Sequence, residues 1–406
     1  MFAMTSVRAT SAPARWYTVF SFLSSWAEGG QAVVLLWLTY SLTSNAFLIG
    51  VMIVLGYLPA AVLGLLFRRF ADRGRAERVA GSTNAVLSGV SLALTVEQLL
   101  AGRAVALAIV VIAASQVVLS VAKMVNKAAL NRLVRDVFPP GTAKRVLEVS
   151  SSASLIGQVV GAGLAGVFLS ANWTAAGLLV SALAYGTGAL ALTFGLRRPA
   201  REEMPEPPVE VKTRAALPAG IGLVLVLVFS VPSSGALQFL NTLLVPLADD
   251  IAHGHPSFYA VLNVVSVAGG FLAGLALSTR VITTEAVLRW GLPTVAVFAA
   301  LLGFITQPWL VAVTAFVLSL VITCHVICMQ VLTNQVPADS QVGQFAVLRN
   351  VVAALAKAVF SFAAGAVVGW WGVRTAAVAL AATTLVFAVA WFVARGKDKG
   401  HDAAHG

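Results

Sequence analysis

The sequence predicts an all-α integral membrane protein whose twelve transmembrane helices form two six-helix bundles. Of the 406 residues, 59% are hydrophobic and 11% are charged, against about 25% charged in ordinary soluble domains. Apolar stretches of about 20 residues recur along nearly the whole chain, and each is long enough to cross a hydrocarbon core of about 30 Å as a helix. A membrane barrel would instead show alternating segments of about ten residues, and these are absent from the sequence.

Each predicted span is an apolar stretch bounded by polar or charged residues. The first six are expected at residues 17–40, 45–67, 79–99, 104–126, 147–169 and 173–196. The other six are expected at residues 217–245, 256–279, 286–306, 308–334, 345–368 and 373–395. Boundaries of this kind are good to a few residues.

The segment 197–215 separates the two sets of spans. It carries four prolines and charges of both signs, a composition typical of a solvated linker. The chain is therefore expected to divide into an N-terminal bundle (1–196), a cytoplasmic linker (197–215), a C-terminal bundle (216–396) and a cytoplasmic tail (397–406). Two six-span bundles joined in this way are the layout of a secondary transporter, with the site near the midplane between them.

Lys and Arg gather between alternate spans. The loops on one side of the membrane are rich in both residues, whereas the opposite side has only Arg103 and Arg374. Arg349, at the start of the eleventh span, is counted with the basic side. Because basic loops stay in the cytoplasm, both termini are expected there, in a bacterial inner membrane. The same distribution accounts for the net charge of +11 without a nucleic-acid partner.

Polar side chains recur at helical spacing in spans one, four, seven and ten. One polar face on several helices is what a transport path needs, although hydrogen bonding between helices is the alternative for any single Ser or Thr. The four sets are Ser21, Ser24, Ser25, Glu28 and Gln31; Gln116, Ser120, Lys123 and Lys127; Ser230, Ser234, Gln238 and Asn241; and Ser319, Thr323, Gln330 and Asn334.

Glu28, Lys123 and Lys357 fall inside predicted spans and are not counted with the basic loops. A charge at the bilayer centre costs about 2.5–3.5 kcal/mol on insertion scales and marks a functional site by default. Glu28 is expected to be paired, hydrated or protonated, and proton binding there is one way to couple transport to H⁺. Lys357 is expected either to pair within the protein or to bind an anionic group. His325 is either a helix–helix contact or a proton relay.

The sequence lacks the motifs of nucleotide-binding proteins and of membrane-embedded enzymes. There is no G-x-x-x-x-G-K-[ST] motif and no intramembrane catalytic set, so an enzyme, a cofactor and a metal are not expected.

Cys324 and Cys328 are interpreted as small hydrophobic residues of a packed helix, and Asp249 and Asp250 as solvated loop residues. Small residues four apart predict close helix contacts at Gly157 and Gly161, Gly270 and Gly274, and Gly365 and Gly369.

The loop after the second span resembles a family motif. Residues 71–75, Ala-Asp-Arg-Gly-Arg, resemble a shortened form of the cytoplasmic loop motif of the major facilitator superfamily. Residues 157–166 are similar to the fifth-span glycine motif of its exporters, without the proline. The resemblance implies a monomer that works by rocking of two bundles. It also implies that Asp72 bonds to a neighbouring helix end and that Arg73 and Arg75 hold the outward-facing state.

Within that superfamily the chain resembles bacterial lysophospholipid transporters and the neighbouring drug and siderophore exporters. Residues 120–123 resemble a Ser-x-Ala-Lys segment of the lysophospholipid group, Glu28 falls where the group has a first-span acid, and residues 281–289 resemble its eighth-to-ninth-span loop. The chain departs from the group at Gln238, where a seventh-span arginine is usual, and at Ala354, near an eleventh-span acid. Lys357 is an additional charge.

Two substrate hypotheses follow, both for an amphipathic molecule. The first is a lysophospholipid-like lipid flipped between leaflets, and the second is proton-coupled export of a drug or siderophore. The residues predicted to bind substrate or proton are Glu28, Gln31, Gln116, Ser120, Lys123, Gln238, Asn241, His325 and Lys357.

Overall fold

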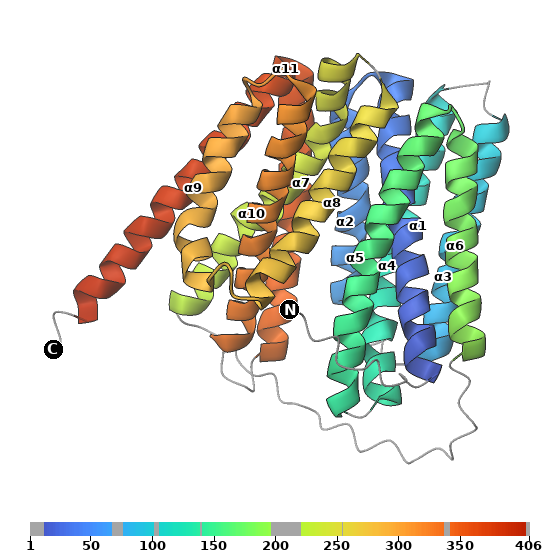
Figure 1. Cartoon of the computed structure of the whole chain (residues 1–406), viewed down its shortest axis with the longest axis horizontal. Helices are drawn as coiled ribbons and strands as arrows, with labels where there is room; N and C mark the ends of the chain where they lie inside the picture. The colour runs from blue at the N-terminus through green and yellow to red at the C-terminus, as the bar shows by residue number, and fades with distance from the viewer. Residues whose placement is uncertain are drawn as a thin grey trace, which may run out of the picture. The chain divides into compact units, whose positions relative to one another are not determined.

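The computed structural model describes residues 12–66, 76–100, 105–138, 140–195, 221–253, 255–336 and 342–402. Long helices make up nearly all of these ranges (Figure 1). The predicted gating residues Asp72, Arg73 and Arg75, and the linker 197–215, lie outside the described residues.

Eleven helices in the described ranges are long and apolar enough to cross a membrane. They are α1 (Ala12–Thr43), α2 (Ala46–Leu66), α3 (Ala76–Leu100), α4 (Val105–Val137), α5 (Pro140–Ser170), α6 (Thr174–Gly195), α7 (Ile221–Ala252), α8 (Pro256–Ser278), α9 (Thr284–Leu302), α10 (Pro308–Gln335) and α11 (Val342–Asp402).

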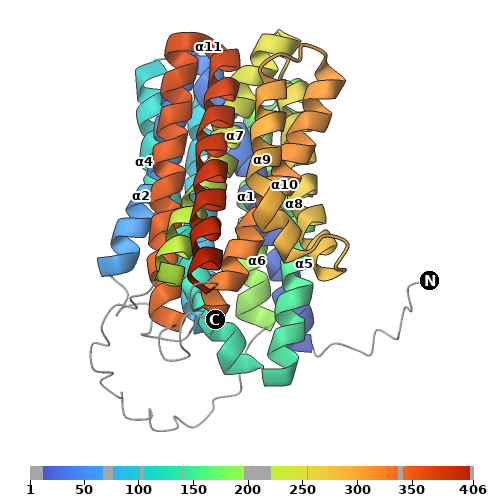
Figure 2. The same ribbon diagram turned by 90° about the vertical axis from the view of Figure 1, so that its left-hand side faces the viewer.

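The 61 residues of α11 contain both the eleventh and the twelfth predicted spans. At about 1.5 Å per residue, one straight helix of this length would cross a hydrocarbon core three times over. The chain instead turns at Gly372, whose backbone angles of φ 84° and ψ 170° are not helical. A residue without Cβ adopts this conformation readily, and Figure 2 shows the two arms of α11 meeting at the turn. The all-α membrane fold is therefore confirmed.

Several helices extend beyond their predicted spans. α4 continues to Val137 and α5 begins at Pro140, because the Lys and Arg that end the apolar stretches are themselves good helix formers. α7 likewise continues to Ala252. Asp249 and Asp250 therefore lie on a helix and not in a loop, which corrects that expectation.

Contacts group the chain into two compact units. Unit 1 comprises residues 1–35 and 62–211, and unit 2 comprises residues 36–61 and 212–406. The end of α1 and most of α2 therefore pack with the C-terminal helices. The predicted division into two bundles at the linker 197–215 describes the order of the spans along the sequence, whereas the two units are defined by contacts. That division stays a prediction.

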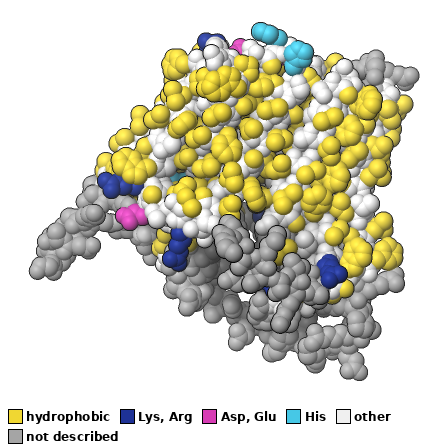
Figure 3. All heavy atoms as spheres, viewed as in Figure 1, with side chains coloured by type: hydrophobic (Ala, Val, Ile, Leu, Met, Phe, Trp, Pro, Cys, Tyr) yellow, Lys and Arg dark blue, Asp and Glu magenta, His cyan; other side chains and the backbone are white. Residues whose placement is uncertain are grey.

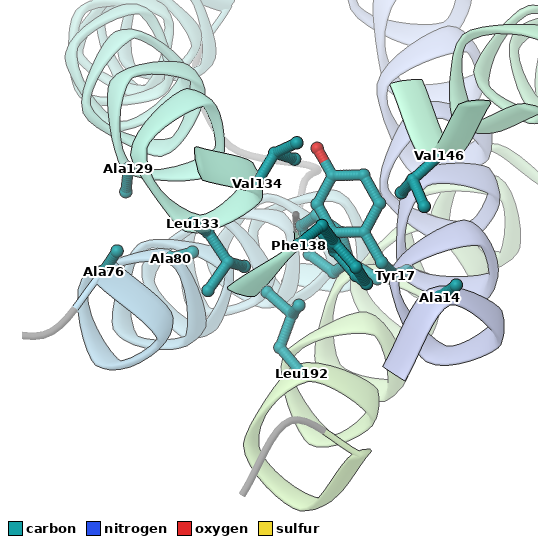
Figure 4. Packing of buried hydrophobic residues seen from close by; sticks show 11 residues of the cluster. Ala14, Tyr17, Ala76, Ala80, Ala129, Leu133, Val134, Phe138, Val146 and Leu192 are labelled. Carbon is teal, nitrogen blue, oxygen red and sulfur yellow. The ribbon is translucent and has the colours of Figure 1, made fainter. Parts of the chain in front are cut away.

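In unit 1, glycines bring α1 and α5 into close contact. A Cβ at Gly29 would lie 2.6 Å from the Gln158 carbonyl oxygen, and a Cβ at Gly161 would overlap the Trp26 carbonyl. The predicted close packing at Gly157 and Gly161 is thus confirmed. At one end of this unit, α1, α3, α4, α5 and α6 share a buried cluster in which Tyr17 meets Phe138 edge to face (Figure 4).

In unit 2, α2 packs tightly on the first arm of α11. A Cβ at Gly50 would lie 2.6 Å from the Ser361 carbonyl oxygen, and one at Gly365 would lie 2.7 Å from the Ala46 carbonyl oxygen. α8 meets α10 at Gly269, where a Cβ would lie 2.6 Å from the Phe316 carbonyl oxygen. A Cβ at Gly274 would meet nothing within 4 Å. The prediction at Gly274 is therefore wrong, because that residue faces open space.

Hydrophobic side chains cover most of the face drawn in Figure 3, and charged side chains gather at its edges. Many large apolar residues are exposed along the helices, including Leu107, Val110 and Val386, each more than 60% exposed. Soluble proteins rarely expose contiguous apolar surface on this scale. Together with the eleven apolar helices, this surface identifies a multi-pass membrane protein.

Candidate functional site

Glu28 and Lys123 form an ion pair inside unit 1. The Lys123 Nζ atom lies 3.2 Å from Glu28 Oε1, and the two side chains are 31% and 45% exposed, respectively. Both residues lie well inside long apolar helices, α1 and α4. Hydrocarbon against the exposed part of either charge would be costly. The accessible part of the pair is therefore best suited to face water or a polar ligand.

The position of Glu28 follows from the packing of α1. Gly29 faces α5 so closely that no side chain fits there, and a Cβ at Gly30 would lie 3.2 Å from the Gly161 carbonyl oxygen. The neighbouring Glu28 therefore lies on another face of the helix. On α4, Ser120 is 3% exposed and lies one turn before Lys123, while Gln116 is half-buried. The polar stripe of the fourth span thus places its lysine beside the first-span acid.

Gln31 belongs to a different polar group. Its Nε2 donates to Ser91 Oγ at 2.8 Å, and its Oε1 accepts from the Tyr185 hydroxyl at 3.5 Å. Gln31 is 1% exposed, and its partners lie on α3 and α6. The structure therefore places this predicted site residue in a helix–helix contact. Ser24 also forms a helix–helix contact, because its hydroxyl donates to Asn84 Oδ1 of α3 at 3.2 Å.

The predicted residues of α7 lie in unit 2. Gln238 is 5% exposed and its backbone carbonyl accepts from Thr242 Oγ1 at 2.9 Å, while Asn241 is half-buried. Ser230 and Ser233 are buried, and each donates back to the carbonyl of its own helix one turn earlier. Internal bonds of this type satisfy a hydroxyl without a ligand.

Lys357 lies midway along the first arm of α11. Its Nζ is 4.9 Å from the ring centroid of Tyr57 on α2, within the range of a cation–π contact. The ring face carries negative charge density, so it stabilises an ammonium without supplying a carboxylate.

His325 lies on α10 at 1% exposure, beside Gly291 of α9. Neither ring nitrogen has a hydrogen-bond partner among the described residues. Within the same ranges, no three His, Cys, Asp or Glu residues lie close enough to hold a metal ion. His325 is therefore an unsatisfied polar group in an apolar contact, flanked by the buried thiols of Cys324 and Cys328.

The structure also brings together residues that the sequence did not single out as site residues. Arg349, counted with the basic loops, is instead 5% exposed, and its Nε donates to Ser230 Oγ at 3.5 Å. Arg349 lies near one end of an apolar span, where a cation is normally assigned to a loop, so the sequence did not predict its burial. Near the far end of α7, Asp249 accepts from the Tyr40 hydroxyl at 2.8 Å. That bond depends on a tertiary contact for which the sequence carries no local signal.

Comparisons with known proteins agree with this architecture. The family model of the Major Facilitator Superfamily matches residues 17–356. No curated protein matches the sequence. Because the family model covers far more than half of the chain, membership does not depend on any single relative.

Three similar solved structures are all transporters or transporter homologues. A bacterial homologue of the human lysosomal transporter Spinster, inward-facing and unoccupied, has 13% identity and a TM-score of 0.71, covering 96% of this chain and 97% of that one. A bacterial homologue of the iron transporter ferroportin has 12% identity and a TM-score of 0.71, covering 93% and 98%. A POT family transporter with a bound peptide conjugate has 10% identity and a TM-score of 0.74, covering 95% and 96%. The chain belongs to the major facilitator superfamily of secondary transporters, which work by alternating access.

Proposed function

We propose that this transporter moves an amphipathic, lysophospholipid-like molecule across the bacterial inner membrane. The observation that supports the proposal is the half-exposed ion pair of Glu28 and Lys123 inside the spans of unit 1. One carboxylate beside one ammonium complements a zwitterionic head, because Lys123 attracts a phosphate and Glu28 attracts an amine. Both termini would be cytoplasmic, and the protein would act as a monomer.

The lining residues around this pair also suit an amphipathic molecule. Ser120 and Gln116 supply neutral hydrogen-bonding groups on the same helix as Lys123, while most other residues of α1 and α4 are apolar. A lipid tail gains free energy from apolar surroundings, and a polar head needs only a few fixed partners. Gln238, Asn241, His325 and Lys357 remain candidates for contact with the substrate.

A second candidate is proton-coupled export of a drug-like or siderophore-like molecule. The exposure of Glu28, at 45%, favours it, because the carboxylate is open to groups from outside the protein. In that mechanism Glu28 would release Lys123 when it takes up a proton, and transport would need a pH gradient. The lipid mechanism needs no such gradient.

The deciding experiment is translocation of lysophosphatidylethanolamine, a zwitterionic lysophospholipid, in proteoliposomes with and without a pH gradient. We expect wild-type protein to move the lipid equally in both conditions, and Glu28→Gln and Lys123→Ala to lose the activity. Glu97→Gln, which removes a carboxylate near the end of α3 in the same unit, is the matched control and should retain it. Movement no faster than in protein-free liposomes would exclude the lipid substrate, and activity that collapses with the gradient would favour the exporter.

A further inference from the structure

Arg349 is a buried cation whose observed partner is a neutral hydroxyl. The side chain is 5% exposed on the first arm of α11, and its Nε donates to Ser230 Oγ of α7 at 3.5 Å, a long contact. Ser230 is fully buried, and its own hydroxyl donates to the Val226 carbonyl at 2.7 Å. Arg349 forms no ion pair and no second hydrogen bond with any residue that the structure describes.

This arrangement leaves most of the guanidinium's bonding capacity unused by described residues. A guanidinium carries five N–H donors, and Nε supplies one of them. Burying a cation without a compensating charge is strongly unfavourable. The planar fork of the remaining N–H groups matches two oxygens of a carboxylate or a phosphate. The group that best completes Arg349 is therefore an oxyanion.

The described carboxylates of unit 2 lie elsewhere. Among its described residues, Asp249 and Asp250 lie near the far end of α7, about five turns beyond Ser230. Glu285 lies in the first turn of α9. No described carboxylate is within salt-bridge distance of Arg349. α7 and α11 pack together beside Arg349 and Ser230, because Val226 of α7 and Phe345 of α11 belong to one buried cluster.

We propose that Arg349, oriented by Ser230, forms a site for an oxyanion, either the phosphate or the carboxylate of the transported molecule. The proposal rests on the transport function above and adds the charge class of the ligand. Ser230 accepts the hydrogen bond from Nε, so the two terminal NH₂ groups of the guanidinium are the ones that donate to the anion in a bidentate contact. Lys357, eight residues further along α11 and over Tyr57, adds positive potential on the same helix arm.

Thermal unfolding of the purified full chain in a nonionic detergent tests this site. The probes are a lysophosphatidate, the monoacylglycerol with the same acyl chain, and inorganic phosphate. We expect the lysophosphatidate to raise the Tm of wild-type protein well above the effect of the uncharged monoacylglycerol. Stabilisation by inorganic phosphate alone, at millimolar concentration and dependent on Arg349, would also support the site and would identify a free anion as its ligand.

Three variants separate a binding role from a structural one. In Arg349→Gln the difference between lysophosphatidate and monoacylglycerol should vanish, and in Ser230→Ala the lysophosphatidate concentration at half-maximal shift should rise several-fold. Arg374→Gln removes an exposed cation of the same helix and should keep the wild-type response. If Arg349→Gln does not fold, Arg349→Lys must still bind the lysophosphatidate more weakly than wild type.

The proposal is overturned if wild-type protein responds equally to the charged and uncharged lipids, or if Arg349→Gln keeps the full lysophosphatidate-dependent shift despite a lower Tm. Its failure differs from failure of the transport function. Lysophosphatidylethanolamine translocation that depends on Glu28 but not on Arg349 would leave the proposed function intact and remove this site alone.

Discussion

The two units accommodate charge inside membrane helices in different ways. Unit 1 places Lys123 against the carboxylate of Glu28 at 3.2 Å, so the pair is neutral. Unit 2 places Arg349 against the hydroxyl of Ser230 and Lys357 over the ring of Tyr57. A neutral pair suits a ligand with both charges, whereas a cation held by a neutral hydroxyl, as Arg349 is, attracts an anion. The charge of the group that holds a cation, and not the cation alone, therefore indicates which ligand the cation attracts.

The largest expected effect is on the pair of unit 1. Glu28→Gln leaves Lys123 without its partner, and breaking a buried pair costs up to about 3–5 kcal/mol, less here because both side chains are partly exposed. We expect the initial rate of lipid translocation to fall by at least about tenfold. Glu28→Asp, which keeps the charge on a shorter side chain, should retain more activity than Glu28→Gln. Equal rates for wild type and Glu28→Gln would show that the pair plays no part in transport.

The glycine contacts provide a second test of the difference between units. Gly161→Ala in α5 forces a Cβ into the Trp26 carbonyl of α1, and overpacking of this kind costs about 1–3 kcal/mol. Gly274→Ala in α8 meets open space and is its matched control. Thermal unfolding should show a clearly lower Tm for the first variant and a wild-type Tm for the second. The same Tm for both would contradict the described α1–α5 packing.

Substitution of Gln31, which lies one turn from Glu28 on α1, tests whether this polar residue contributes to stability or to the transport path. Gln31→Leu removes the hydrogen bonds to Ser91 and Tyr185 and leaves buried groups unsatisfied, at about 1–3 kcal/mol. We expect a lower free energy of unfolding, with transport per folded molecule within about twofold of wild type. A fall in transport as large as that of Glu28→Gln would instead make Gln31 part of the path.

The smallest expected effect concerns Lys357. Tyr57→Leu removes the ring under its ammonium, and such contacts are worth about 0.5–2 kcal/mol. Tyr57→Phe keeps the ring and should lose less stability than Tyr57→Leu. Chemical unfolding of the two variants measures the difference directly. Equal losses would mean that the hydroxyl, and not the ring face, accounts for the contribution of Tyr57.

The fold was predictable because the bilayer imposes it. Apolar stretches of membrane length and basic loops determine which segments cross, and even the turn at Gly372 lies between two predicted spans. The candidate site was predictable only in part. The cost of a mid-span charge identified Glu28, Lys123 and Lys357, but no periodicity indicates that Glu28 meets Lys123, because that contact depends on how α1 packs against its neighbours.

Burial near a helix end is the feature that sequence patterns miss. Arg349 resembled a loop cation because it begins an apolar span, yet tertiary packing buries it to 5% exposure. Gln31 shows a second limit of sequence patterns, since its helical spacing with Glu28 does not distinguish a transport path from a contact with α3 and α6.

The most direct test of the central claim exchanges the charges of the pair. In the double variant Glu28→Lys, Lys123→Glu, the attraction between the two side chains is preserved, but each charge now lies where the other was. If the pair binds the head of the substrate, thermal stability should return close to the wild-type Tm while translocation of lysophosphatidylethanolamine stays lost. Recovery of both stability and translocation would contradict the account, because the pair would then serve only to hold α1 against α4.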